Sequence, residues 1–335
     1  MTGPKIAVLG AGSWGTALAL QLDRSGSHSI LWDRDTENLE KIRAARLNHR
    51  YLPGIDIPES IVIENDMLTA VKASDHVLVV TPSHAFTAVM KTVREVLVQG
   101  QGVAWACKGF EPGSGRLLHQ VALELLPKST PLAIATGPSF AKEVAMNLPT
   151  AITVAGPDRD FTKAMADALH GGRFRAYTSD DMIGAELGGA VKNVMAVATG
   201  ICDGLELGDN ARAALITRGL AEMMRLGAAL SAKPETLMGL AGAGDLILTC
   251  TGDLSRNRQL GLKLGKGKTL EQALEEIGQV VEGVNSAVEV QRLAIQHGIN
   301  MPITEQVNGI IHLGWNPVEG VARLLAREQK AEYGD

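Results

Sequence analysis

A glycine-rich turn between an apolar strand and an apolar helix constrains the fold of this chain most strongly. Residues 6–9 are four consecutive apolar residues that predict a buried strand, and Gly-Ala-Gly-Ser-Trp-Gly follows directly. Apolar residues then recur at helical spacing. Gly10, Gly12 and Gly15 have the spacing of a dinucleotide-binding turn, in which a helix N-terminus offers unpaired N–H groups to a pyrophosphate. A glycine-rich turn of another α/β protein is the alternative.

Apolar strands alternate with helices over the first half of the chain. We predict further strands at 29–32, 75–80, 103–106, 132–135, 150–154 and 174–177, a helix at 36–45 and a loop at 51–54. This alternation predicts an α/β, doubly wound and mostly parallel sheet of the Rossmann type over residues 1–180. From residue 181 long helical segments take over, such as 183–198, 210–230 and 257–264. We therefore predict an all-helical second domain over residues 181–335, which would bind the substrate.

Charge and composition exclude several classes of protein. The chain has 335 residues and a net charge of −5, so it offers no basic face for a nucleic acid. An anionic small molecule would need positive charges gathered locally. Three widely spaced cysteines suit a reducing compartment better than a disulfide framework or a zinc site, and no metal is expected.

No uncharged apolar run reaches the roughly 18 residues of a membrane span. The apolar run after Lys5 superficially resembles a signal peptide, but its cleavage would remove the glycine turn. We therefore expect a cytoplasmic protein.

Candidate ligand-binding residues follow the predicted strands, whose carboxyl ends face the ligand in open α/β sheets. Lys108 follows the strand at 103–106, and Gly137 and Ser139 follow the strand at 132–135. At the end of the second strand, Asp33 would bind a ribose hydroxyl whereas Arg34 would accommodate a 2′-phosphate. The cofactor preference therefore stays open, with Arg34 favouring NADPH over NADH.

The helical half supplies a candidate acid–base group. Lys192 and Asn193 interrupt an otherwise apolar helix, and burial lowers a lysine pKa enough for general acid–base work. A lysine that extends its stem along an apolar face is the alternative. Asp245, after a flexible glycine stretch, is a candidate partner for Lys192.

The segment 255–258, Ser-Arg-Asn-Arg, brings a hydroxyl, two guanidinium groups and an amide to a helix start. That combination suits a phosphate, although a solvated turn is the alternative.

Nine segments in order resemble bacterial NAD(P)-dependent glycerol-3-phosphate dehydrogenase. They are GAGSWGTALA, YLPG, KG at Lys108, GPSFAKE, GGAVKN, ARAALITRGLAEM, GLAGAGDLILTCT, SRNR and QVVEG. The resemblance implies reversible reduction of dihydroxyacetone phosphate to sn-glycerol 3-phosphate for phospholipid synthesis. It also implies a helical C-terminal domain like that of 6-phosphogluconate dehydrogenase, and a homodimer.

The resemblance further implies roles for individual residues. Lys192 matches the catalytic lysine, Lys108 a lysine that touches cofactor and substrate, and Thr249 a hydroxyl near the catalytic group. The implied substrate site comprises Lys108, Gly137, Ser139, Lys192, Asn193, Asp245, Ser255, Arg256 and Asn257. The implied cofactor site comprises Gly10, Gly12, Ser13, Trp14, Gly15, Arg34, Tyr51, Lys108, Ala141, Arg256, Val280 and Glu282.

Two other functions are compatible with a nucleotide-binding α/β chain. One is a dehydrogenase of the same architecture that acts on a hydroxy acid such as 6-phosphogluconate. The other is a nucleotide-binding redox sensor without chemistry, which would have no need for a buried lysine opposite the glycine turn.

Overall fold

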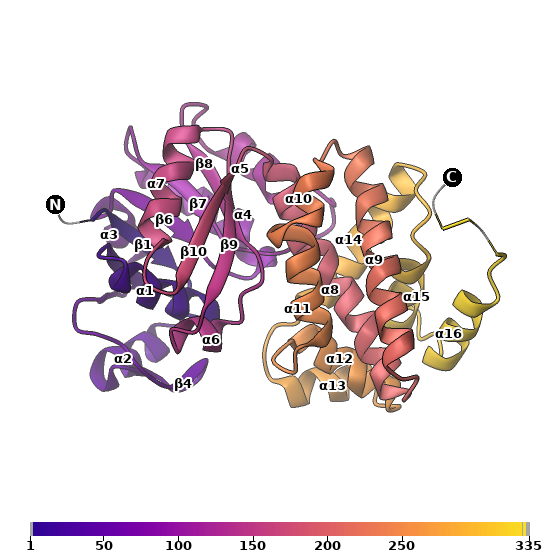
Figure 1. Ribbon diagram of the computed structural model, residues 1–335. Coiled ribbons are helices and arrows are strands. Elements are labelled where there is room, and N and C mark those ends of the chain that lie inside the picture. The colour runs from indigo at the N-terminus through magenta and orange to yellow at the C-terminus, as the bar shows by residue number, and fades with distance from the viewer. Residues whose placement is uncertain (1–2, 330, 333–335) are drawn as a thin grey trace.

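The computed structural model describes residues 3–329, 331 and 332. An α/β half and a helical half lie side by side (Figure 1). The α/β half is built on an eight-stranded sheet of order β10-β9-β8-β7-β6-β1-β2-β5. The strands are β1 (Lys5–Leu9), β2 (His28–Trp32), β5 (Val62–Glu64), β6 (His76–Val79), β7 (Gly102–Trp105), β8 (Leu132–Thr136), β9 (Thr150–Ala155) and β10 (Phe174–Ser179). All neighbours pair in parallel except β8 and β9, which are antiparallel. The predicted mostly parallel sheet is confirmed.

Helices cover both faces of this sheet, because its strands are apolar on both sides. They are α1 (Ser13–Arg24), α2 (Thr36–Ala45), α3 (Met67–Lys72), η1 (Ser83–Ala85), α4 (Phe86–Val96), α5 (Leu118–Leu125), α6 (Ala141–Ala145) and α7 (Arg159–Leu169).

Two elements of this half depart from the prediction. The segment 51–54, predicted as a loop, lies largely in strand β4 (Leu52–Asp56), which pairs with β3 (Leu47–Asn48) in a separate two-stranded hairpin. Proline and glycine suggested a turn, but an isolated hairpin tolerates both because it leaves one edge of each strand unpaired. Strand β5 was also not predicted.

The helical half contains ten further segments. They are α8 (Met182–Gly204), α9 (Asp209–Ala229), α10 (Pro234–Met238), the π-helical turn η2 (Leu240–Gly244), α11 (Asp245–Thr251), α12 (Arg256–Gly265), α13 (Leu270–Ile277), α14 (Glu282–Gln296), α15 (Pro302–His312) and α16 (Pro317–Leu325). No helix in the described ranges is both long and apolar enough to cross a membrane.

The last strand ends at Ser179 and α8 begins at Met182, and we propose the boundary between the domains at 180/181.

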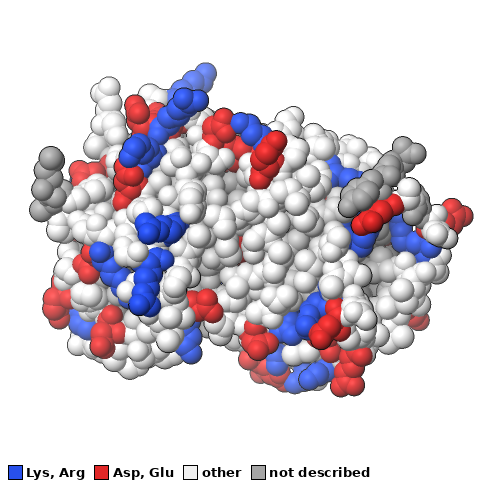
Figure 2. Space-filling view, in the orientation of Figure 1, with Lys and Arg blue, Asp and Glu red and all other residues white. Residues whose placement is uncertain are grey.

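Helix α8 is buried along most of its length and organises the helical half. Its small residues allow neighbouring backbones to approach closely. A Cβ atom added at Gly200 would lie 2.1 Å from the Arg258 carbonyl oxygen, and one added at Gly261 of α12 would lie 2.0 Å from that of Val197. Figure 2 shows charged side chains mostly near the ends and edges of the molecule, with a largely uncharged surface over α11.

The two halves interlock through the segment after β7. Phe110 and Leu117, joined by an isolated β-bridge, are 2% and 4% exposed and belong to the apolar core of the helical half. The α/β half therefore inserts part of its own chain into the neighbouring core.

The glycine turn has the geometry that its spacing predicts. Gly10 has φ +125°. A Cβ atom at Gly15 would lie 1.8 Å from the Gly10 carbonyl oxygen, whereas one at Gly12 would meet nothing within 4 Å. Gly15 thus permits the tight contact within the turn, and Gly12 leaves open space above it.

We predict that Gly15→Ala destabilises the protein by about 3 kcal/mol, because the added methyl group cannot fit without backbone movement. Gly12→Ala, whose φ of −70° suits any residue, should cost about 1 kcal/mol at most. Urea unfolding of both variants measures the difference. Equal losses would contradict this assignment of the two glycines.

Candidate active site

Two lysines share one buried aspartate at the junction of the two halves. Lys192 Nζ lies 2.5 Å from Asp245 Oδ1, and Lys108 Nζ lies 2.8 Å from Asp245 Oδ2. The Asp245 side chain is only 1% exposed, whereas those of Lys192 and Lys108 are 8% and 15% exposed. The carboxylate is therefore the most deeply buried of the three groups, and Lys108 retains the largest exposed fraction.

Three different segments bring these charges together. Lys108 follows β7, Lys192 lies in the middle of α8, and Asp245 begins α11. The glycine stretch before Asp245, predicted to be flexible, is instead the regular π-helical turn η2. A Cβ atom at Gly242 would lie 2.0 Å from the Leu237 carbonyl oxygen, so only glycine fits this turn.

Burial changes the acid–base behaviour of the cluster. The pKa of Lys192 is lowered to about 7 as the net result of three influences: burial lowers it most, the Asp245 carboxylate raises it, and the neighbouring Lys108 cation lowers it. A lysine in this state exists as a mixture of charged and neutral forms near neutral pH, as proton transfer in both directions requires.

A chain of side-chain amides extends from the cluster across the junction. Asn193 Nδ2 donates to the Lys108 carbonyl oxygen at 3.0 Å. Asn257 Nδ2 donates to Asn193 Oδ1 at 2.9 Å, and Asn257 Oδ1 accepts from Gly283 N at 2.9 Å. These bonds connect the end of β7 to α8, α12 and α14.

Other candidate residues border the cluster. The hydroxyl of Thr249 donates to the Asp245 carbonyl oxygen at 2.6 Å. The Gly137 carbonyl oxygen accepts from Lys108 Nζ and from Ser139 Oγ, both at 2.9 Å. Gly137 has φ +139°, which other residues rarely adopt.

The polar side chains of the segment 255–258 have different partners. Ser255 caps α12 by accepting from Arg258 N at 3.2 Å. Arg258 forms ion pairs with Asp203 and Asp253, so its guanidinium is already engaged, contrary to the expectation that both arginines serve a phosphate. Arg256 is exposed, donates to Gln279 Oε1 at 3.3 Å, and forms no ion pair in the part of the chain that the structure describes.

The candidate cofactor residues gather at two places. At the glycine turn, Ser13 Oγ donates to the Tyr51 carbonyl oxygen at 2.6 Å, and the buried Trp14 Nε1 has no hydrogen-bond partner among the residues that the structure describes. Ala141 opens α6, which packs against α1. Across the junction, Val280 is 42% exposed and Glu282 begins α14.

Two functions of residues in this region were not predicted. Glu282 accepts hydrogen bonds from Ser83 N at 3.0 Å and Ser83 Oγ at 2.5 Å, which join the two halves. Ser83 follows strand β6, and that position was the one signal in the sequence. Asp33 Oδ2 accepts from Ala11 N at 2.6 Å and Oδ1 from Asp35 N at 3.0 Å, so Asp33 holds the glycine turn.

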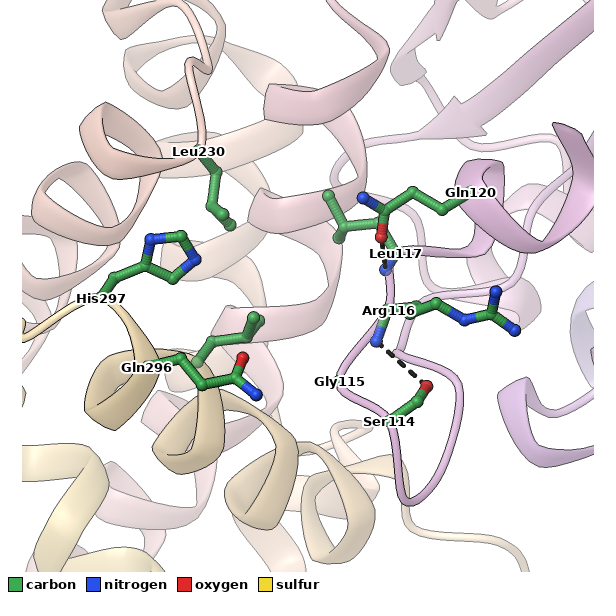
Figure 3. Close-up of a pocket in the computed structure, with 9 residues that line it drawn as sticks. Ser114, Gly115, Arg116, Leu117, Gln120, Leu230, Gln296 and His297 are labelled. Atoms are coloured by element: carbon green, nitrogen blue, oxygen red, sulfur yellow. Dashed lines mark hydrogen bonds between the residues drawn. The ribbon is translucent and has the colours of Figure 1, made fainter. Parts of the chain in front are cut away.

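A separate cavity of about 300 Å³ lies between the loop at 114–117 and the ends of α9 and α14. Figure 3 shows the Arg116 side chain directed away from Leu230 and His297. Arg116 is instead paired with Glu111 and Glu124. This cavity contains none of the candidate site residues.

Comparison with known proteins identifies the family. The model for the NAD-dependent glycerol-3-phosphate dehydrogenase N-terminus matches residues 5–162, and the model for the C-terminus of the same family matches residues 181–322. The chain belongs to the NAD-dependent glycerol-3-phosphate dehydrogenase family. Its activity is that of an NAD(P)-dependent glycerol-3-phosphate dehydrogenase, an oxidoreductase.

Individual relatives within the family cover the whole chain. Glycerol-3-phosphate dehydrogenase [NAD(P)+] of Stenotrophomonas maltophilia (strain R551-3) is 60% identical over 334 residues, which are 100% of this chain and 98% of that protein. The crystal structure of glycerol-3-phosphate dehydrogenase from Coxiella burnetii is 46% identical, with a TM-score of 0.94, and the match covers 98% of this chain and 100% of that one.

We predict that Asp245→Asn lowers the free energy of unfolding by about 3–5 kcal/mol at pH 6, because two ammonium groups lose their buried counter-charge. The pKa of Lys192 falls from 10.5 to about 7 on folding, so the folded wild-type protein already holds Lys192 neutral well above pH 7. The loss should therefore shrink at pH 9.

Urea unfolding at both pH values measures this loss. Asp253→Asn is the control, because Asp253 is 96% exposed in its pair with Arg258 and its removal should cost less than about 1 kcal/mol at either pH. A loss for Asp245→Asn that is equal or larger at pH 9 would argue against the shared counter-charge.

Proposed function

We propose that this chain reduces dihydroxyacetone phosphate to sn-glycerol 3-phosphate, with Lys192 as the general acid. The single observation that carries the proposal is the cluster of Lys192, Lys108 and Asp245, in which two ammonium groups share one carboxylate that is buried at the junction. Positive charge at that position would stabilise the negative charge that develops on a carbonyl oxygen.

The electrostatics of the cluster explain why Lys192 supplies the proton. As the substrate carbon is reduced, its carbonyl oxygen gains negative charge and takes a proton from Lys192 Nζ. Lys192 is then neutral, a form that its burial favours. Asp245 keeps enough of Lys192 protonated for the next turnover, and Lys108 adds positive potential without giving up a proton. In the reverse reaction, neutral Lys192 accepts the proton of the alcohol.

The glycine turn fits a dinucleotide. No side chain caps the N-terminus of α1, and the space above Gly12 is open, so the first N–H groups of α1 are free to bind a pyrophosphate. Trp14 Nε1, buried without a partner, is a further donor at this turn. The bound nicotinamide supplies the hydride for the carbonyl carbon.

The substrate phosphate would bind where α12 begins. Arg256 is exposed and forms no ion pair within the described residues, although the Glu282 carboxylate acts on its charge, and Asn257 lies in the amide chain that leads to Lys108. Binding the phosphate there would orient the carbonyl group at the lysines, which converts binding energy into positioning. Ser139 and Gly137 border the same region.

We infer a preference for NADPH over NADH from the end of β2. Both Asp33 oxygens accept backbone N–H groups, one from Ala11 in the glycine turn and one from Asp35, so the carboxylate is already engaged by the protein. Arg34 is exposed beside it and would pair with a 2′-phosphate.

The product suggests a role in phospholipid synthesis, and we propose a homodimer. The exposed apolar side chains of Met238, at the end of α10, and of Ile247, in α11 whose surface is weakly charged, support self-association. Light scattering coupled to size-exclusion chromatography tests the dimer, and a mass of one chain at assay concentration would reject it.

We predict that Lys192→Met lowers kcat by about 10²–10⁴-fold while NADPH binding, followed by fluorescence titration, stays within about twofold. In the wild-type protein, kcat/KM for reduction should be constant below pH 7 and fall above it, because the protonated lysine is lost. The oxidation reaction should show the opposite dependence.

Lys163→Met is the matched control, since the Lys163 side chain is 70% exposed and should leave turnover unchanged. Near-normal turnover of Lys192→Met would remove its proposed role. Assays of dihydroxyacetone phosphate and 6-phosphogluconate in parallel test the substrate, and faster turnover of the sugar acid would favour the other dehydrogenase.

We predict that Arg34→Ala raises the KM for NADPH by about tenfold or more, since a charge-assisted hydrogen bond contributes about 1.5–3 kcal/mol. The KM for NADH should change little and serves as the internal control. Initial rates with both cofactors measure the effect, and equal changes for the two would rule out a 2′-phosphate contact.

A further inference from the structure

A second buried carboxylate joins the two halves outside the lysine cluster. Glu186 in α8 is 3% exposed. Its Oε1 accepts from Trp105 Nε1 at 3.1 Å and from His119 N at 2.9 Å, and its Oε2 lies 2.5 Å from His119 Nδ1. One carboxylate thus connects α8 to the end of β7 and to the start of α5.

These contacts lie on the two elements that carry the candidate catalytic lysines. Trp105 is the last residue of β7, three residues before Lys108. Glu186 precedes Lys192 by six residues in the same helix, or about 9 Å along its axis. The bond between Glu186 and Trp105 therefore fixes α8 relative to the strand end that positions Lys108.

Further contacts along α8 depend on the same register. A Cβ atom at Gly189 would lie 3.0 Å from Thr136 Oγ1 and 3.5 Å from Lys108 Cγ. One turn later, Asn193 donates to the Lys108 carbonyl oxygen. Helix α8 therefore contacts the carboxyl ends of β7 and β8 at successive turns, through Glu186, Gly189 and Asn193.

Apolar burial alone does not specify the exact orientation of this part of α8. Between Glu186 and Lys192, α8 presents Leu187 to Val191, a run of small and aliphatic residues. Burial of such residues is non-directional, so it defines the orientation of the helix less sharply than directional contacts do. Hydrogen bonds to a carboxylate are directional and lose strength when their angles change.

We propose that Glu186 is a positioning residue, which sets the register of α8 against β7 and thereby aligns Lys192 and Lys108 on Asp245. This inference rests on the role proposed for Lys192. A displacement of about 1 Å at a reacting group can cost roughly 100-fold in rate, so a loss of this anchor should affect turnover more than cofactor binding.

The test compares two buried glutamates. We expect Glu186→Ala to lower kcat for dihydroxyacetone phosphate by about 10–100-fold, with NADPH affinity within about twofold. Glu186→Gln should recover most of this loss, because its amide oxygen can still accept from Trp105 Nε1 and its N–H can donate to His119 Nδ1. Glu222→Ala is the control, since Glu222 is 1% exposed and accepts from Ile303 N and Thr304 N in the helical half. It should lower stability without lowering kcat.

Two additional measurements separate positioning from a loss of folding. His119→Ala removes one contact from a partly exposed helix start and should give a smaller loss of kcat in a folded protein. The pH at which kcat/KM declines should also move in Glu186→Ala, because the distances of Lys192 from its charged neighbours change.

The inference is overturned if folded Glu186→Ala and His119→Ala both keep wild-type kcat and pH profile, or if Glu222→Ala loses as much kcat. If Glu186→Ala does not fold, His119→Ala decides, and wild-type kcat and pH profile in that variant overturn the inference. Failure of the proposed function can be told apart from failure of this inference. In the first case Lys192→Met would keep turnover, whatever the Glu186 variants do.

Discussion

The shared pairing of Asp245 with two lysines is the interaction on which the site depends. A single carboxylate at 1% exposure cannot neutralise two ammonium groups, so the cluster carries an excess of positive charge whenever Lys192 is protonated. Buried charge of this kind is costly and adds little to stability by itself. Its role would instead be to place positive charge where a substrate carbonyl oxygen becomes negative. Neither half of the chain contains the cluster alone, because Lys108 follows β7 in the α/β half, whereas Lys192 and Asp245 lie in helices of the other half.

The surrounding structure can be understood as support for this cluster. Glycines allow α12 to pack against α8 at backbone distance, and the π-helical turn η2 directs Asp245 toward Lys192. Asn193 and Asn257 connect the helices back to the sheet, and Ser83 with Glu282 closes the junction at a second point. These contacts are polar and directional, which suits a junction whose two sides must be aligned rather than only held together.

Short stretches of the sequence were sufficient to predict most of the sheet, the glycine turn and the long helix α8. Apolar periodicity and glycine spacing can each be recognised within a few residues. The pairing of Lys192 with Asp245 was also anticipated, since an unpaired charge in an apolar helix needs a partner. The contacts of Glu186 with Trp105 and His119, and of Glu282 with Ser83, join residues that are distant in the sequence, and no local pattern reports them. Asp33 was considered as a ribose ligand because its position fits, yet its carboxylate binds the backbone of the glycine turn. The strand β4 was missed because its proline and glycine usually mark turns.

We expect the cluster to hold Lys192 close to the midpoint between its charged and neutral forms near neutral pH. Direct NMR titration of the lysine side chains, with Lys192→Met for assignment, measures this without reference to turnover. We predict a Lys192 midpoint near pH 7 in the free protein, displaced from its ordinary value of 10.5 by burial and by the neighbouring Lys108. A Lys192 midpoint above pH 10 would contradict it.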